Sequence, residues 1–322
     1  MAFTVDLEKF RFDEAMRPGV EGKRVLITGA GRDGGLGQAF ALAAGLNGAD
    51  AVGVHFHRSS EDGFDLVAAL ESAGVRAFPL QADVTNFGDL WASRSYVIEQ
   101  FDGLPPNLVV CNSGLTERGY SFGRALKQLE GESMAQRRAR VRQGFIDNLA
   151  ESRLVLDTKI DGFLATTHLW AGEALHAEQP MRLVYVSSRQ AIDPGASVPG
   201  YAISNWAVLQ LPSVLKVNLG RSAGLVNAFS MLLPFVRTGM TDEYAENPKV
   251  FGRWQPRMLE THEAAEAQLQ LLTQPPEVTE DGMFELMVEA AGEGHVAVTW
   301  NQVRLEVREE ILGWSSDRPL RY

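Results

Sequence analysis

Six short apolar runs, separated by helix-like segments, constrain the fold of this chain more than any other feature. The runs are Arg24–Thr28, Ala51–Phe56, Ala77–Gln81, Leu108–Asn112, Leu183–Ser187 and Val226–Leu233. Strands that are apolar along their whole length are buried on both faces, which is typical of parallel sheets. The helical segments between them supply right-handed crossovers. The pattern predicts the α/β class, with a doubly wound parallel sheet and helices on both faces.

Two segments exceed a minimal domain of this kind. Thr116–Arg153 is charged and helical in character, and its sparse apolar positions predict an insertion outside the core. After Met240 we expect a helix over Thr261–Thr273, capped by Thr261. The stretches GMFELMVE and HVAVTWNQVRLEV then predict a last sheet strand and a small hairpin. We therefore expect one domain over residues 1–322, with a core at about 20–240, an insertion at about 116–153 and a C-terminal extension at about 241–322.

Composition excludes several functional classes. Hydrophobic residues make up 45% of the 322 residues and charged residues 22%, which is ordinary for a globular protein. The formal net charge of −11 argues against nucleic-acid binding, and the basic run Arg137–Arg142 is interpreted as a solvated helix face. We expect no membrane span, no secretory signal and no metal site. The single cysteine, Cys111, fits a reducing compartment and a cytoplasmic location.

The glycine-rich segment TGAGRDGGLG follows the first strand and opens a helix. In that context Gly29 permits the tight turn, Gly35 lets the backbone approach a pyrophosphate, and Gly37 lets the helix pack close to the sheet. The helix N-terminus presents free N–H groups to phosphate. The segment predicts a Rossmann-type dinucleotide site, although an ordinary strand-to-helix turn is the alternative. The predicted contacts come from Thr28, Gly29, Gly31, Arg32, Gly35, Leu36 and Gly37.

The end of the second strand indicates which nicotinamide cofactor fits. A carboxylate there would bind the ribose 2′-hydroxyl of NAD, but none occurs before Glu61. Arg58 can pair with a 2′-phosphate, and Arg32 can assist it. NADP(H) is therefore favoured over NAD, unless both arginines simply face water. Asp83 can accept a hydrogen bond from an adenine amino group, or it is only a helix N-cap or turn residue. His57, Ser59 and Val84 complete the residues expected around the nucleotide.

A serine and a tyrosine form the candidate catalytic pair. Ser188 ends the fifth strand, and Tyr201 opens the next helix 13 residues later. Residues from a strand end and a helix start can meet at the carboxyl edge of a parallel sheet. The alternatives are a strand-end cap and a packing residue.

These motifs together resemble the short-chain dehydrogenase/reductase family over about residues 23–240. The resemblance is carried by TG…GGLG, VVCNSG, VSS, Tyr201 and PFVRTGM. It implies that the segment after the sixth strand runs beside the nicotinamide, with cofactor contacts from Pro234, Val236 and Thr238. It also implies cofactor contacts from Asn112, Ser113 and Gly114, where the family usually has Asn-Ala-Gly.

Two positions depart from the common family pattern. That pattern has a lysine four residues after the tyrosine, where this chain has Asn205, and an asparagine on the helix before the serine strand, where it has Lys159. The exchange resembles the ketoreductase domains of modular polyketide synthases. It implies that Lys159 and Asn205 belong to the site with swapped positions. The glycine loop is two residues longer than usual, and the tail after Met240 differs from the family ending.

The resemblance implies an NADPH-dependent ketoreductase that reduces a carbonyl to an alcohol. Tyr201 would be the general acid, Ser188 would bond the carbonyl oxygen, and Lys159 would favour the phenolate. The substrate would be a small-molecule carbonyl compound of polyketide or β-ketoacyl type, free or carrier-bound. A homo-oligomer would form through Leu154–Ala171 and Tyr201–Ser213. The alternatives are a non-catalytic NAD(P)-binding sensor or assembly subunit, and a dehydratase or epimerase with tightly held NAD.

Overall fold

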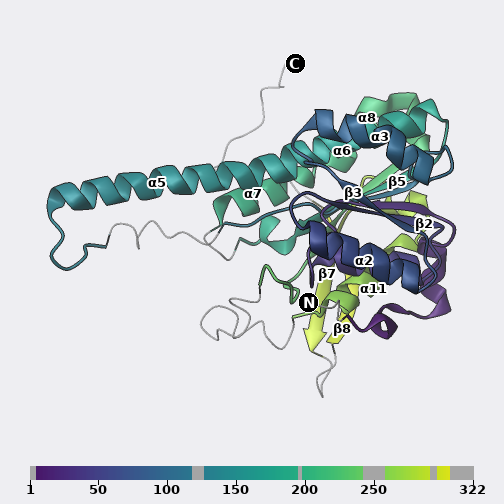
Figure 1. The fold of residues 1–322 in the computed structure, drawn as a ribbon, viewed down its shortest axis with the longest axis horizontal. Coiled ribbons are helices and arrows are strands. Elements are labelled where there is room, and N and C mark those ends of the chain that lie inside the picture. The colour runs from purple at the N-terminus through teal and green to yellow at the C-terminus, as the bar shows by residue number, and fades with distance from the viewer. Residues whose placement is uncertain (1–4, 118–126, 195–197, 242–257, 291–295, 305–322) are drawn as a thin grey trace, which may run out of the picture.

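The computed structural model describes residues 5–117, 127–194, 198–241, 258–290 and 296–304. Its centre is an eight-stranded sheet in the order β3-β2-β1-β4-β5-β6-β7-β8 (Figure 1). Neighbouring strands run parallel up to β7, and β8 is antiparallel to β7. The strands are β1 (Arg24–Ile27), β2 (Ala51–Phe56), β3 (Ala77–Gln81), β4 (Leu108–Cys111), β5 (Met181–Ser188), β6 (Val226–Leu233), β7 (Met283–Ala290) and β8 (Val296–Val303). The predicted doubly wound sheet is confirmed.

Helices cover both faces of this sheet, and each face has its own apolar layer. Helices α1, α2 and α11 pack on one face, and α3, α6 and α8 lie on the other (Figure 1). The helices are α1 (Leu36–Leu46), α2 (Ser60–Ser72), α3 (Phe87–Gln100), α5 (Met134–Leu156), α6 (Gly162–His176), α7 (Pro199–Val208), α8 (Leu211–Leu219), α11 (Thr261–Leu272) and α12 (Pro276–Thr279). Short 3₁₀ turns occupy Leu7–Phe10, Glu14–Gly19, Arg189–Ala191 and Gly220–Leu225.

Burial explains why the strand predictions succeed. All residues of β2 are buried, so the strand contacts side chains on both faces, as a continuous apolar run requires.

The predicted N-cap of α11 is wrong. Glu260, and not Thr261, is the N-cap of α11, and it forms a capping box with Glu263. A glutamate can accept from the helix amides as a threonine would, so the prediction is one residue off.

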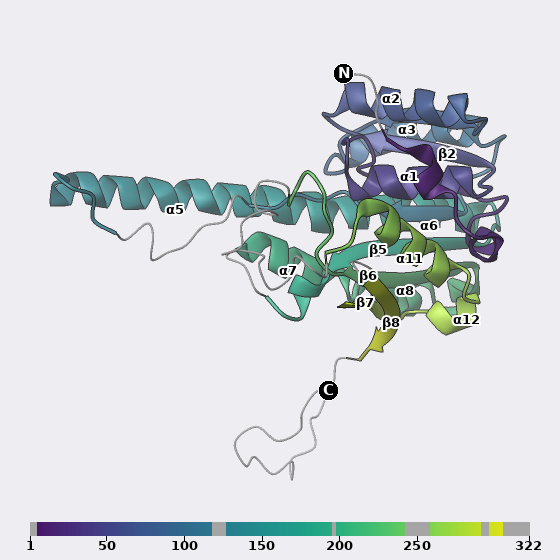
Figure 2. The same ribbon diagram turned by 90° about the horizontal axis from the view of Figure 1, so that it is seen from below.

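The helical insertion contains α5, which projects far from the rest of the molecule in two perpendicular views (Figures 1 and 2). A capping box between Ser133 and Gln136 starts the helix at its outer end. Its inner end packs against α7 and runs into a π-helical turn, Asp157–Asp161, which leads directly into α6. The segment 118–126 of the predicted insertion lies outside the described residues.

The chain after Met240 completes the sheet. β7 extends it beside β6, and β8 folds back on β7 as a hairpin at the edge, as predicted. The final residues of the predicted hairpin, 305–307, lie outside the described residues. Within the described ranges, every helix is too short or too polar to cross a bilayer.

Candidate active site

The candidate catalytic pair lies where β5 ends and α7 begins. Ser188 is the last residue of β5, and its Oγ accepts a hydrogen bond from the backbone N–H of Gln190 at 3.2 Å. Tyr201 is in the first turn of α7, which begins at Pro199. The Ser188 hydroxyl is near enough to the Tyr201 phenol to affect its pKa. The structure therefore brings together two side chains that were paired only by spacing.

The surroundings of Tyr201 favour its neutral phenol. Removal from water raises the pKa of Tyr201, and the nearby Ser188 hydroxyl opposes this increase in part. A neutral phenol carries a proton that it can donate. A cation would be needed to stabilise the phenolate left behind.

Lys159 lies in the π-helical turn and is only 6% exposed. Its Nζ donates to the backbone oxygen of Val186 in β5 at 2.6 Å and lies 4.7 Å from the centre of the Phe163 ring. Burial lowers the pKa of Lys159 to about 7, and the nearby Cys111 thiol opposes the shift. The turn that carries Lys159 packs against α7. A buried amine of this kind exchanges a proton near neutral pH.

Asn205 follows Tyr201 by one helical turn and is 1% exposed. Its Nδ2 donates to the backbone oxygen of Tyr201 at 2.8 Å, and its own backbone oxygen accepts from Ser187 Oγ at 2.9 Å. Its Oδ1 is buried and has no partner among the described residues. The amide therefore holds its own helix, and the expected contact with Lys159 stays a prediction. This Oδ1 is therefore an acceptor with open hydrogen-bonding capacity.

The glycine loop is held tightly against the end of β4. Gly29 has φ +68°, a conformation that favours glycine, and a Cβ there would lie 2.8 Å from Ser113 Cα. A Cβ on Gly37 would lie 2.4 Å from the Gly29 oxygen. The Asn112 amide donates to the backbone oxygens of Thr28 (3.1 Å) and Gly29 (3.2 Å). The hydroxyl of Thr28 accepts from the backbone amides of Asn112 and Ser113. The close packing predicted for Gly37 is confirmed.

The same loop fits a pyrophosphate. Helix α1 begins at Leu36, and its N-cap, Gly35, provides no side-chain cap. The first amides of the helix are therefore free to bind an anion. Gly31 lies against Phe56, where a Cβ would come within 2.4 Å of the phenylalanine Cβ. Backbone amides at the start of a helix suit the pyrophosphate of a nicotinamide dinucleotide.

Arg32 connects the glycine loop to the segment after β6. Its Nη2 donates to the backbone oxygen of Gly239 at 2.8 Å. Thr238 lies in the same segment, where its hydroxyl accepts from the Met240 amide. The segment starts at Pro234 and is fixed at Val236, which forms a β-bridge with Leu259. Because Arg32 makes this contact, its assistance to a 2′-phosphate stays a prediction.

The residues expected around the adenosine end lie at neighbouring strand ends. His57 and Arg58 are exposed after β2, and Ser59 is the N-cap of α2. His57 Nδ1 lies 3.7 Å from Asp83 Oδ2, after β3. Burial raises the pKa of Asp83, but hydrogen bonds from Thr85 and the charges of His57 and Arg58 outweigh it, so the pKa is lowered. Val84 is buried against Gly162.

Sequence reasoning did not give His55 a role at this site. His55 is buried in β2, and its Nδ1 accepts from the Gly29 amide at 3.2 Å. Burial lowers the pKa of His55 to about 4, so the imidazole is neutral and Nδ1 stays an acceptor. The available signal was the position of His55 inside an otherwise apolar run, because a polar side chain in a strand that is buried on both faces needs a hydrogen-bond partner.

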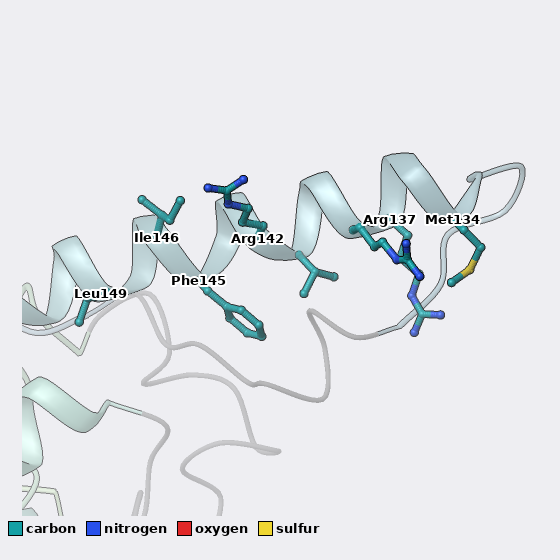
Figure 3. A pocket seen from close by; sticks show the side chains of 8 residues that line it. Met134, Arg137, Arg142, Phe145, Ile146 and Leu149 are labelled. Atoms are coloured by element: carbon teal, nitrogen blue, oxygen red, sulfur yellow. The ribbon is translucent and has the colours of Figure 1, made fainter.

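A hollow of about 520 Å³ lies away from this site, along the outer part of α5 (Figure 3). It is lined by Met134, Arg137, Arg138, Val141, Arg142, Phe145, Ile146 and Leu149. Its lining contains none of the predicted catalytic residues. The described ranges also contain no group of three or more His, Cys, Asp or Glu side chains that could hold a metal ion.

Comparison with known proteins agrees with this geometry. The sequence model of the short chain dehydrogenase family matches residues 23–249. A hydroxynaphthalene reductase of Aspergillus fumigatus is 27% identical over 214 residues, which are 66% of this chain and 66% of that protein. The alignments with the first curated relatives span between 36% and 66% of those proteins' own length.

Solved structures show the same fold. A 3-oxoacyl-[acyl-carrier protein] reductase with bound NAD from Brucella melitensis has a TM-score of 0.63 at 23% identity, over 85% of this chain and 94% of that chain. A gluconate 5-dehydrogenase from Burkholderia cenocepacia, in complex with NADP and tartrate, has a TM-score of 0.64 at 18% identity, over 87% and 96%. With the family match over most of the sheet and both halves of the site, this chain belongs to the short-chain dehydrogenase family.

Proposed function

We propose that this chain is an NADP(H)-dependent ketoreductase that reduces a carbonyl group to an alcohol. The observation that carries the proposal is the placement of Ser188 and Tyr201 where β5 packs against α7, together with the packing against α7 of the turn that carries the buried Lys159. A non-catalytic nucleotide sensor would need the glycine loop but none of these three groups. The similarity to a hydroxynaphthalene reductase supports a carbonyl substrate of polyketide type. The shared fold of a 3-oxoacyl-[acyl-carrier protein] reductase is compatible with a substrate of β-ketoacyl type, free or carrier-bound.

Each group of the site has a chemical part in this proposal. When bound, the reduced nicotinamide supplies a hydride to the carbonyl carbon. Ser188 bonds the carbonyl oxygen as negative charge develops on it, and Tyr201 gives that oxygen its proton. The Lys159 ammonium favours the phenolate that remains and can return a proton to it. Asn205 Oδ1 is the acceptor for the lysine or for a relay water.

The cofactor preference rests on the end of β2. Arg58 is exposed there, and no carboxylate occurs between the end of β2 and Glu61. A guanidinium suits a 2′-phosphate, whereas a carboxylate would suit the free 2′-hydroxyl of NAD.

The proposal also includes a single domain, a cytoplasmic location and a homo-oligomer. Exposed apolar side chains at Leu154, Ile203 and Trp206 support assembly through α5 and α7.

The test is the oxidation of NADPH with a panel of ketones that includes a bicyclic ketone and a β-ketoacyl thioester, with NADH in parallel. We expect turnover with NADPH that falls by about 10²–10⁴-fold in Tyr201→Phe, while NADPH binding is retained. Full turnover in Tyr201→Phe would remove the catalytic assignment. NADPH binding without any turnover, across carrier-bound substrates as well, would favour the sensor. A protein that binds no NADPH would overturn the interpretation of the glycine loop.

A further inference from the structure

Glu117 belongs to a charged stretch of sequence, yet it is buried, with 5% exposure. It lies in the segment after β4, near the start of the insertion. A carboxylate removed from water is costly unless hydrogen bonds replace its hydration. Its partners therefore show what this buried charge holds in place.

Three donors from two other elements converge on the Glu117 carboxylate. Oε1 accepts from the Gly200 amide at 2.5 Å and from Ser152 Oγ at 2.8 Å. Oε2 accepts from the amide of Tyr201 at 3.1 Å. Gly200 and Tyr201 form the first turn of α7, where amides have no partner within the helix. The carboxylate therefore binds the backbone of the proposed proton donor itself.

The fit around Gly200 shows that this approach is built into the sequence. A Cβ at Gly200 would lie 2.6 Å from Glu117 Oε1 and 2.8 Å from the backbone oxygen of Ser152. Any larger residue would push α7 away from both groups. The N-cap of α7, Val198, provides no side-chain hydrogen bond. Glu117 supplies that missing cap from elsewhere in the chain and joins it to α5 through Ser152.

We infer that Glu117 is a positioning residue, which fixes the first turn of α7 against α5 and so fixes where the Tyr201 hydroxyl meets Ser188. The inference rests on the proposed function, in which Tyr201 delivers the proton. A reacting group misplaced by about 1 Å can lose on the order of 10²-fold in rate. The nucleotide contacts on the glycine loop are separate from this anchor. The anchor therefore acts on turnover and leaves cofactor binding unchanged.

Glutamine is the informative substitution at this position. The two backbone groups that Glu117 binds can only donate, and they bind different oxygens of the carboxylate. In Glu117→Gln one of them must face an NH₂ group, whichever way the amide is turned. Glu117→Asp keeps both oxygens but shortens the side chain. Glu173→Gln is the matched control, because Glu173 is a partly buried carboxylate that binds Arg94 between α3 and α6.

The experiment compares kcat at saturating NADPH, the Kd for NADPH and the melting temperature in these variants. We expect Glu117→Gln to lower kcat by at least about tenfold, with Kd within about twofold of the wild type. Glu117→Asp should recover part of the loss. It also replaces Glu117→Gln in the comparison if that variant does not fold. Glu173→Gln should lower the melting temperature by about as much as Glu117→Gln does, and should leave kcat unchanged. A wild-type kcat in Glu117→Gln would overturn the inference.

Amide hydrogen exchange gives a second readout that does not depend on turnover. In the wild type we expect slow exchange at Gly200 and Tyr201, and in Glu117→Gln exchange at least about tenfold faster at these amides. Unchanged exchange would show that Glu117 does not anchor α7, and would overturn the inference whatever the kinetics. A wild type that reduces no carbonyl compound would instead overturn the proposed function, while the exchange result still decides whether the anchor exists.

Discussion

The two halves of the candidate site are built in different ways. The nucleotide half is held by backbone geometry, because Gly29 and Gly37 lie so close to their neighbours that a Cβ would overlap backbone atoms. The catalytic half is held by buried polar groups. Lys159 keeps an amine out of water, and Asn205 keeps an oxygen without a partner among the described residues. The nucleotide half is close-packed, whereas the catalytic half contains buried polar groups whose hydrogen-bonding capacity is not fully used.

This difference separates stability from chemistry. Close-packed backbone defines a surface that an anion can meet without rearrangement, so its residues serve the fold and the cofactor together. Buried polar groups with open hydrogen-bonding capacity destabilise the folded chain, and functional sites are where such groups are retained. Substitutions in the two halves should therefore change stability in opposite directions.

The largest expected effect is at Lys159. In Lys159→Met we expect turnover to fall by about 10²-fold or more, while the cofactor-free protein becomes more stable at pH 7 and below. Burial lowers the pKa of Lys159 from its ordinary value of 10.5 to about 7. Between these values the unfolded chain binds more protons, so wild-type stability rises with pH across that window. Below pH 7 the wild type carries the full cost of a buried charge.

The measurement is urea unfolding of both proteins from pH 6 to about pH 10.5. The stability advantage of Lys159→Met should shrink as the pH rises through this range. A difference that is independent of pH would show that Lys159 is not a titrating buried charge, and the contrast between the two halves would lose its main support.

The second effect is at Gly37, in the nucleotide half. A methyl group there meets the Gly29 oxygen, a backbone atom that cannot move aside. We expect Gly37→Ala to lower the free energy of unfolding by about 1–3 kcal/mol, and to weaken NADPH binding at the same time. Thermal melting and a fluorescence titration with NADPH would check both.

Gly172→Ala is the control for Gly37→Ala. Gly172 is an exposed position of α6 where a Cβ would meet nothing within 4 Å. We expect this alanine to stabilise the protein by about 0.5–1 kcal/mol through helix propensity. Equal effects from the two alanines would contradict the account of the glycine loop as close-packed backbone.

The smallest effect is at Arg58, on the exposed rim of the nucleotide half. We expect Arg58→Ala to weaken NADPH binding by roughly tenfold, since a charge-assisted hydrogen bond contributes about 1.5–3 kcal/mol before solvent competition. NADH binding should change little. Arg32→Ala is the comparison, because its contact with Gly239 predicts equal weakening of both cofactors. If Arg58→Ala also weakens both equally, Arg58 does not distinguish the phosphate.

The sequence was sufficient for the sheet because each strand contains its own signal. Continuous apolar runs predicted β2, β3 and β6 at their observed bounds, since burial on both faces depends on local residues alone. The placement of Ser188 and Tyr201 at the junction of β5 and α7 was also predictable, because they are only 13 residues apart in the sequence. The swapped Lys159 was placed only by resemblance, and its π-helical turn has no simple pattern in the sequence.

Contacts between distant residues were not predictable in the same way. Arg32 resembled a phosphate ligand, yet it binds a carbonyl 207 residues further along the chain. Glu117 was predicted to be part of a charged insertion outside the core, yet it is buried and binds residues of both α5 and α7. Both side chains are polar, so neither composition nor periodicity indicates which neighbour the fold brings to them.

The π-helical turn at Asp157–Asp161 has a geometric consequence for the whole projecting helix. α5, this turn and α6 form one helical path from Met134 to His176. Each residue of an α-helix advances its direction by about 100°, and a π-helical turn accommodates one residue more than a regular turn. Removing a single residue there would rotate everything on one side of it by about that angle. Either Lys159 would leave its place beside β5, or α5 would no longer project from the same side of the molecule. The rotational phase of this continuous helix therefore couples the direction of the Lys159 side chain to the direction in which α5 projects.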